Sequence, residues 1–200
     1  MRQILTVMLE DGRDDHKQRF PRAAALDVVR ELIPVLTPAC ERIIVAGSLR
    51  RRKADVGDIE LLYVPRLGLV RQGLFDGEQN MADLAIAELE KCCVLSRRTN
   101  VNGSEMFGQK NKLMRHTISG IPIDLFATTA EAWANYLVCR TGGAESNVHI
   151  AAAAKRQGMR WNPYGVGFTR LSDSQVLPVA NEQDVFGIAG LPYLEPWERP

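Results

Sequence analysis

The hydrophobic pattern of the chain predicts two amphipathic helices. Over residues 22–36, apolar side chains recur every three or four positions, which is the spacing of one helix face, and Pro34 is expected to kink or end this helix. Residues 79–93 have the same spacing and predict a second helix. The intervening residues 65–77 are rich in glycine and turn residues, so we expect a loop there.

Short apolar runs predict strands over residues 3–9, 43–46 and 58–64, with a polar loop over 10–19. A β-hairpin is expected from residues 113–118 and 121–126, joined by a turn at Ser119-Gly120. Within it, Ile121, Ile123 and Leu125 share one face and Asp124 lies on the other. This mixture of elements favours an α+β fold with an α/β-type mixed sheet flanked by the two helices.

The candidate chemistry lies between residues 41 and 64. The run at 43–46 ends at Gly47-Ser48, and four basic residues follow at 50–53. A strand over 58–64 puts Asp58 and Glu60 on one face, where two adjacent carboxylates are expected to bind cations. A strand, a Gly-Ser turn and a helix start offer backbone N–H groups to a phosphate. Metal ligands that follow a phosphate cradle are what nucleotidyl transfer from a triphosphate requires.

Composition adds limits to this picture. The 25 basic and 24 acidic residues of the 200-residue chain nearly cancel, so any DNA affinity must come from local patches. The four cysteines show no C-x-x-C spacing, and we interpret them as reduced core thiols of a cytosolic protein. Residues 4–9 are too short to span a membrane, and no targeting segment is visible. We therefore expect a cytoplasmic monomer without a membrane segment.

The motif GSLRR, followed by GDIE, resembles the palm signature of the family X DNA polymerases within the polymerase β-like nucleotidyltransferases. The distance from Gly47 to Asp58 matches the family without a gap. Asp124, in an Ile-Asp-Leu-Phe context, stands where the family has its third acid. Antibiotic-modifying and tRNA-tailing transferases share the first motif but not the C-terminal features. Those features are matched by Thr141, Gly142, Asn147, Gly158, Asn162 and Tyr164 and by the closing segment after residue 180.

The resemblance implies a role for each matched residue. Asp58, Glu60 and Asp124 would be the catalytic acids and would hold two Mg²⁺ ions, with Mn²⁺ as a substitute. The implied nucleotide-binding residues are Gly47, Ser48, Arg51, Gly57, Gly142, Gly143 and Asn147. Arg50, Arg52 and Lys53 are interpreted as solvated or DNA-facing charges. Lys110, Lys112, Arg115 and His116 cluster at the hairpin, either as primer-phosphate contacts or as an exposed basic turn.

The chain departs from the family pattern at several positions. Glu60 replaces the usual Asp, and Cys139-Arg140 replaces an aromatic pair beside the incoming sugar, so we expect weak exclusion of ribonucleotides. Ala151 and Pro122 stand where the family has arginines. The residues before Gly47 contain no helix-hairpin-helix signal. We therefore expect a minimal form without an amino-terminal lyase domain, and a weak grip on DNA.

Three functions remain open on this reading. The favoured one is Mg²⁺-dependent transfer from a (deoxy)nucleoside triphosphate to a DNA 3′-hydroxyl, as in gap-filling repair or replication on a primer-template. The second is a nucleotidyltransferase that works without a template or on another acceptor. The third is a non-catalytic nucleotide- or DNA-binding relic. For each we expect a palm domain over residues 1–130 and a C-terminal subdomain over 131–200 that closes over the nucleotide.

Overall fold

The computed structural model describes residues 18–72, 75–100 and 102–200. The strand expected at 3–9 and most of the loop expected at 10–19 lie outside the described residues. The helix predicted over 22–36 is confirmed as α1 (Arg22–Leu36). Pro34 lies inside α1, which ends two residues later, and the backbone then tightens into the 3₁₀ turn η1 (Thr37–Ala39).

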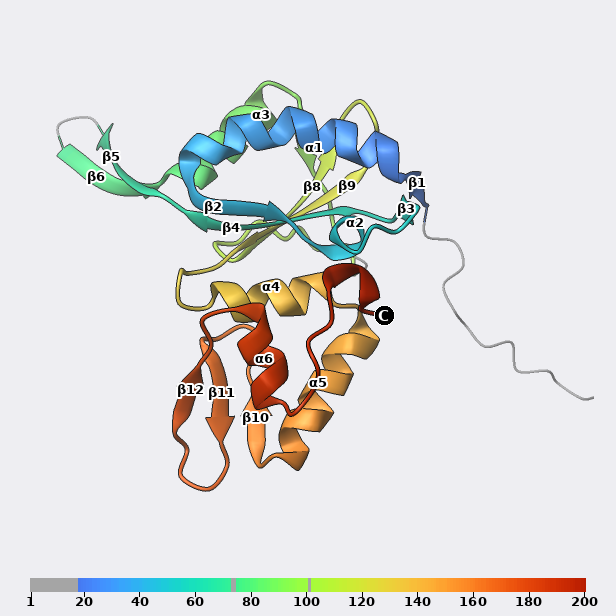
Figure 1. Ribbon diagram of the computed structural model, residues 1–200. Helices are drawn as coiled ribbons and strands as arrows, with labels where there is room; N and C mark the ends of the chain where they lie inside the picture. Colours follow the sequence, from blue (N-terminus) through green and yellow to red (C-terminus); the bar gives the residue numbers. More distant parts are fainter. Residues whose placement is uncertain (1–17, 73–74, 101) are drawn as a thin grey trace, which may run out of the picture.

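A mixed β-sheet forms the centre of the molecule, which confirms the α+β class (Figure 1). Within the described residues its strand order is β2-β4-β9-β8-β7. The central strands β4 and β9 run parallel, and the other neighbours are antiparallel. The strands are β2 (Cys40–Val45), β4 (Ile59–Pro65), β7 (Leu95–Arg97), β8 (Asn111–His116) and β9 (Pro122–Ala127).

The two faces of this sheet pack against different helices. On one face lie α1 and α3 (Met81–Lys91) (Figure 1). The core on this side includes the fully buried side chains Ile59, Leu61 and Ile123. On the other face α4 (Trp133–Thr141) packs on Leu62 and Phe126 through Tyr136 and Leu137. Because side chains alternate along a strand, Glu60 and Asp124 belong to the α4 face.

The C-terminal third packs around a second apolar cluster that includes Val138, Phe168 and Val185. In Figure 1 this part lies below the sheet, beyond α4. Its elements are α5 (Ala144–Arg156), β10 (Met159–Trp161), β11 (Gly167–Arg170), β12 (Val176–Pro178), α6 (Glu182–Ile188) and η2 (Pro196–Glu198). The domain boundary expected near residue 131 stays a prediction.

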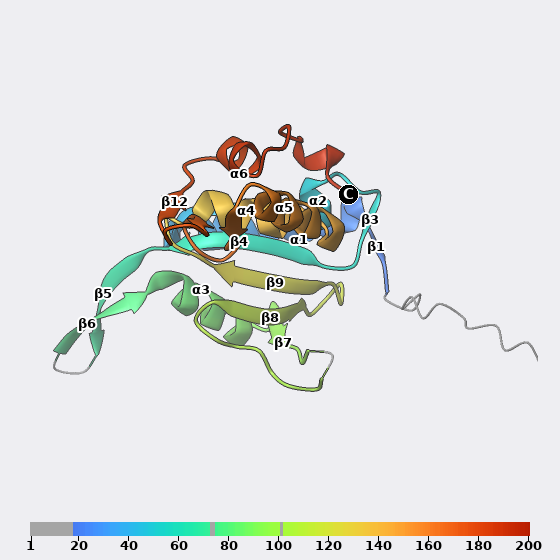
Figure 2. The same ribbon diagram turned by 90° about the horizontal axis from the view of Figure 1, so that it is seen from below.

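The loop predicted over residues 65–77 was wrong. Strands β5 (Leu67–Gln72) and β6 (Phe75–Asn80) form an antiparallel hairpin that projects away from the sheet (Figures 1 and 2). Leu67 and Leu69 alternate with Gly68 and Val70, a period of two that the glycines obscured. Leu69 is 78% exposed, so this strand is held by its hairpin pairing and not by burial.

The cysteines only partly follow the expectation of core thiols. Cys40 and Cys139 are buried, whereas Cys92 and Cys93 are exposed at the end of α3, where the prediction was wrong. Both terminate the helix, and Cys93 has the left-handed backbone (φ +57°) of a residue just past a helix end. No helix in the described part of the chain is long and apolar enough to cross a membrane.

Candidate active site

Gly47 starts the short helix α2 (Gly47–Arg50) directly after β2 and Ala46. Its φ of +59° is a left-handed value that side chains disfavour. A Cβ at this position would lie 1.8 Å from Oε2 of Glu60. Glycine is therefore needed twice here, for the backbone turn and for the space that the Glu60 carboxylate occupies.

The three predicted acids meet at the start of the two parallel strands. Glu60 of β4 is paired in register with Asp124 of β9, and Asp58 precedes β4 by one residue. The pKa of Glu60 is raised to about 7 in total, first by burial and then by the charge of Asp58. Arg140 opposes this shift, Asp124 adds to it and Arg51 opposes it. These electrostatic effects require the other two carboxylates to lie near Glu60.

Asp124 forms an ion pair with Arg98, which follows β7. The two side chains are only 17% and 20% exposed. The cation beside Asp124 thus comes from the neighbouring segment and not from position 122, which is proline. Within residues 18–72, 75–100 and 102–200, no three His, Cys, Asp or Glu side chains are arranged to hold a metal ion in this structure.

A polar pocket of about 250 Å³ adjoins these acids. It is lined by Arg19, Ser48, Arg51, Gly57, Asp58, Glu60, Gly142 and Gly143. The pocket therefore brings together most of the residues predicted to bind nucleotide, from α2, the start of β4 and the turn between α4 and α5. Of the predicted residues, Gly47, Asp124 and Asn147 are outside this lining.

Two side chains of the GSLRR motif place polar groups at the pocket. The Ser48 hydroxyl is buried and has no hydrogen-bond partner among the described residues. Arg51 donates from Nη1 to the carbonyl of Thr141 at 2.6 Å. Burial lowers the pKa of Arg51, and the nearby Glu60 and Asp58 carboxylates oppose that shift. A buried hydroxyl and a partly desolvated guanidinium are groups that a phosphate can pair with.

The interpretation of Arg50 as a solvated or DNA-facing charge was wrong. Its guanidinium donates to Oγ1 of Thr141 at 2.7 Å and to Oε2 of Glu182 at 3.0 Å. Glu182 also pairs with the fully buried Arg199 at 2.7 Å. Arg50 therefore joins α2 to α4 and α6. Arg52, by contrast, is exposed and its guanidinium lies 3.9 Å from the ring centroid of Trp197.

The turn between α4 and α5 is held by contacts within the chain. Asn147 donates from Nδ2 to the carbonyl of Cys139 at 2.9 Å, and a Cβ on Gly142 would come within 3.1 Å of Asn147 Oδ1. The N–H of Gly143 donates to the carbonyl of Pro200 at 3.0 Å. In this structure Asn147 shapes the turn beside the pocket, and its predicted contact with a base stays a prediction.

Two members of the basic cluster at the hairpin are buried, so the picture of an exposed basic surface was wrong for them. Lys112 is 2% exposed and pairs with Asp83 of α3 at 2.7 Å. His116 is 4% exposed, and its Nε2 lies 3.2 Å from Oε2 of Glu31 on α1. Both partners are distant in sequence, which is why the local pattern of charges misled.

Arg19 is a pocket residue that the sequence reasoning missed. Residues Phe20–Pro21 (β1) pair with Asp55–Val56 (β3), which brings the start of the described chain beside Gly57. Arg19 then donates from Nε to Oδ1 of Asp55 at 2.8 Å and from Nη2 to its carbonyl at 2.9 Å. A single arginine in a polar stretch carries no chemical signal, and only this strand pairing exposes its position.

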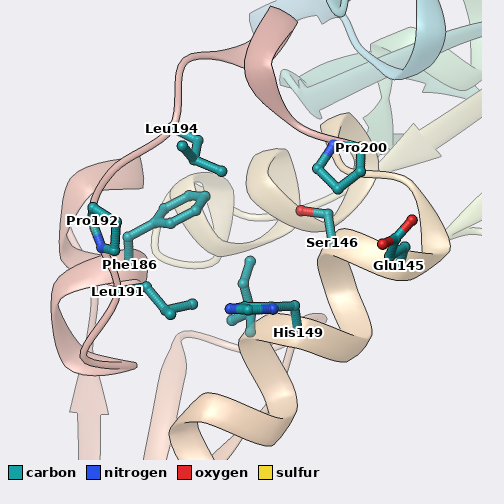
Figure 3. A pocket seen from close by; sticks show the side chains of 9 residues that line it. Glu145, Ser146, His149, Phe186, Leu191, Pro192, Leu194 and Pro200 are labelled. Atoms are coloured by element: carbon teal, nitrogen blue, oxygen red, sulfur yellow. The ribbon is translucent and has the colours of Figure 1, made fainter.

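A second pocket lies between α5 and α6 (Figure 3), and none of the three acids lines it. It measures about 140 Å³ and is mainly apolar, with Phe186, Leu191 and His149 around it. None of the predicted site residues lines it. The polar pocket beside α2 is therefore the candidate active site.

Comparison with known proteins shows which proteins this chain is similar to. Residues 136–200 match the family model described as the DNA polymerase beta thumb. The chain is 29% identical to DNA polymerase lambda of Rattus norvegicus over 203 aligned residues, which cover 93% of this chain. It spans 34% of the length of that relative. The chain is thus similar to family X DNA polymerases, in its C-terminal part to the thumb and over nearly its whole length to DNA polymerase lambda.

Proposed function

We propose that the chain transfers a nucleotide from a (deoxy)nucleoside triphosphate to a DNA 3′-hydroxyl, as a gap-filling polymerase. The observation that carries this proposal is the polar pocket that combines Ser48 and Arg51 with Asp58 and Glu60. Phosphate-binding groups and carboxylates within one pocket are what the transfer of a phosphoryl group requires. The relationship to DNA polymerase lambda supports DNA as the acceptor.

The side chains of the pocket have distinct roles in this proposal. Arg51 and Arg19 lie on the pocket wall and would pair with triphosphate oxygens. The unpartnered Ser48 hydroxyl would donate to a phosphate oxygen and so satisfy its own buried hydrogen-bonding group. Gly142 and Gly143 present no side chain, which leaves room for the sugar at the pocket edge.

The three carboxylates have the donor chemistry that Mg²⁺ prefers, since each supplies hard oxygen ligands. The raised pKa of Glu60, caused by burial and then by its acidic neighbours, indicates that cationic charge is favourable at this position. Asp58, Glu60 and Asp124 would hold the ions, with Asp124 exchanging its contact with Arg98. Mg²⁺ held there would supply the Lewis-acid chemistry that the 3′-hydroxyl and the transferred phosphoryl group require.

One primer-extension series tests the proposed function. The purified chain is incubated with MgCl₂ and all four dNTPs on the same labelled primer as a single strand, in a nicked duplex and in a gapped duplex. Template-directed filling of the gap supports the proposal. Equal extension of the single strand points instead to transfer without a template, and no extension of any substrate contradicts both.

A further inference from the structure

A third pocket lies on the C-terminal part of the molecule, outside the candidate active site. It has a volume of about 250 Å³ and is formed between α5 and the β10–β11 pair. Its lining residues are Ala151, Lys155, Met159, Arg160, Trp161 and Leu171. None of them belongs to the site described above.

The pocket combines an apolar interior with two cations. Met159 packs on the apolar cluster below, and Leu171 exposes 56% of its surface at the opening. Lys155 and Arg160 are both exposed, and neither forms an ion pair with a carboxylate in the described residues. The nearby Arg170 differs, because it pairs with Asp173 at 2.9 Å. Lys155 and Arg160 are therefore available to an anionic partner.

An unpaired nucleotide has the chemistry that fits this pocket. Its base is a flat, largely apolar ring, and the phosphates on either side are anions that two flanking cations can bind. A base within a duplex is paired and stacked, and cannot enter.

The position of the pocket agrees with such a ligand. Helix α5 begins beside Gly142 and Gly143, which line the candidate active site. Ala151 lies eight residues beyond Gly143, or ~12 Å along a helix at 1.5 Å per residue. A DNA strand advances ~3.4 Å per nucleotide, so this distance corresponds to about three or four nucleotides.

We propose that the pocket between α5 and β10 holds an unpaired base of a single DNA strand, with Lys155 and Arg160 on the flanking phosphates. The inference deepens the proposed function and rests on it for the choice of DNA as ligand. It gives the molecule a contact with single-stranded DNA a few nucleotides away from the candidate active site.

Two phenylalanine variants test whether the pocket itself binds. Ala151 and Ala152 are neighbouring exposed residues of α5, but only Ala151 lines the pocket. In Ala151→Phe the new ring fills the pocket without changing the charge, whereas Ala152→Phe is the matched control. Fluorescence anisotropy with labelled oligo(dT), without metal or triphosphate, measures the affinity. We expect Ala151→Phe to weaken binding about tenfold, in line with the loss of one stacked base, and Ala152→Phe to change it less than twofold.

The salt dependence of the same binding separates the pocket from its cations. Lys155→Ala or Arg160→Ala should each lower the slope of log K against log salt by ~0.7, the value for one single-strand phosphate. Ala151→Phe should leave the slope unchanged. Thermal melting checks that each variant is folded, and Leu171→Glu, at an exposed rim position, replaces Ala151→Phe if that variant melts early.

The proposal would be overturned if neither phenylalanine variant weakened binding to oligo(dT). It would also be overturned if both variants weakened binding equally, because that result assigns binding to the α5 surface in general. A matching loss of affinity for a blunt duplex in Ala151→Phe would overturn it as well. These outcomes are independent of the proposed function, because the assay contains no substrate for transfer. A chain that binds oligo(dT) through the pocket but extends no primer would contradict only the polymerase proposal.

Discussion

At the scale of single residues, the contact between Arg98 and Asp124 has the clearest consequence for cation binding. Arg98 places a guanidinium on Oδ1 of Asp124 within a largely buried pair. A guanidinium on one oxygen of a carboxylate repels a second cation that binds the same group. Arg98 and a divalent ion therefore compete for Asp124.

Replacing Arg98 should therefore strengthen cation binding. We expect Arg98→Ala to raise the affinity for Mn²⁺ about tenfold, because a neighbouring cation that disfavours a second positive charge by ~1.4 kcal/mol is removed. Electron paramagnetic resonance of free Mn²⁺ measures this directly. Arg97→Ala is the matched control, since Arg97 is the adjacent arginine but pairs with Glu90 at 2.8 Å. An affinity that stays the same or falls in Arg98→Ala would show that the arginine does not compete.

Residues 139–143 bear on the choice of sugar. Cys139 and Arg140 replace the aromatic pair expected there, and the Arg140 guanidinium lies 3.6 Å from the ring centroid of Phe126. A Cβ on Gly143 would come within 2.6 Å of the Pro200 carbonyl, so this turn presents no side chain to the pocket. A steric gate that lacks bulk excludes little.

We expect the chain to use ribonucleotides nearly as well as deoxynucleotides. The measurement is kcat/KM for dGTP and for GTP on one gapped template. A preference for dGTP above about a thousandfold, or ~4 kcal/mol in the transition state, would show that another group forms the gate. In that case Arg140→Ala should lower the preference.

At the scale of elements, one buried carboxylate joins α6 to α2 and to the end of the chain. Burial acts to raise the pKa of Glu182, but hydrogen bonds and charges from Arg50 and Arg199 outweigh it, so the pKa is lowered from 4.5. A lowered folded-state pKa means that the unfolded chain binds the proton more readily. The stabilisation is therefore complete above pH ~4.5 and is lost as the pH falls through the folded-state value.

Glu182→Gln should destabilise the protein at pH 7 by ~3 kcal/mol, because it leaves Arg199 buried without its counter-charge. The difference from the wild type should shrink as the pH falls from ~4.5, where the unfolded chain takes up the proton, through the lower folded-state pKa of Glu182. Urea unfolding at several pH values measures both effects, and Glu41→Gln on the exposed start of β2 is the control. A difference that is constant with pH would exclude the ionised carboxylate as the cause.

The elements also show which features of the fold can be predicted from local sequence patterns. The bounds of α1 and the strand faces of Glu60 and Asp124 follow from local periodicity, which depends only on neighbouring residues. The pairing of Glu60 with Asp124 does not, because it joins strands that are remote in sequence. The hairpin β5–β6 was missed because glycines at Gly68 and Gly77 outweighed a period of two. Buried Lys112 and paired Arg50 were missed because their partners, Asp83 and Glu182, are remote in sequence.

In the candidate site, too, contacts between residues remote in sequence were the ones that could not be predicted. The resemblance to the family motifs predicted most of the pocket lining, including Gly142 and Gly143, which are remote from Ser48 in the sequence. Arg19 could not be predicted, because its place depends on the pairing of β1 with β3. The role of Arg98 depends likewise on where the segment after β7 folds back.

At the scale of the whole molecule, the balance of acidic and basic residues limits the affinity for DNA. The net charge is +1, and several of its cations are engaged in ion pairs within the chain. We expect duplex binding to be weak and to involve only a handful of phosphates, with a log–log salt slope of ~0.9 for each. Fluorescence anisotropy with a labelled duplex, titrated over the usual range of about 50 to 200 mM salt, measures this slope. Nanomolar affinity that persists at high salt would reveal a further DNA-binding surface.

The central claim is that Asp58, Glu60 and Asp124 support nucleotidyl transfer, and single-turnover extension of a gapped primer by Asp58→Asn tests it most directly. We expect the rate to fall by at least about a hundredfold, because the variant loses one ligand charge. The melting temperature should be unchanged or raised, since the charge of Asp58 acts to raise the pKa of Glu60 and its removal relieves repulsion. Asp173→Asn, an exposed acid in the turn after β11, should extend at the wild-type rate. Retention of more than about a tenth of the wild-type rate in folded Asp58→Asn would contradict the claim.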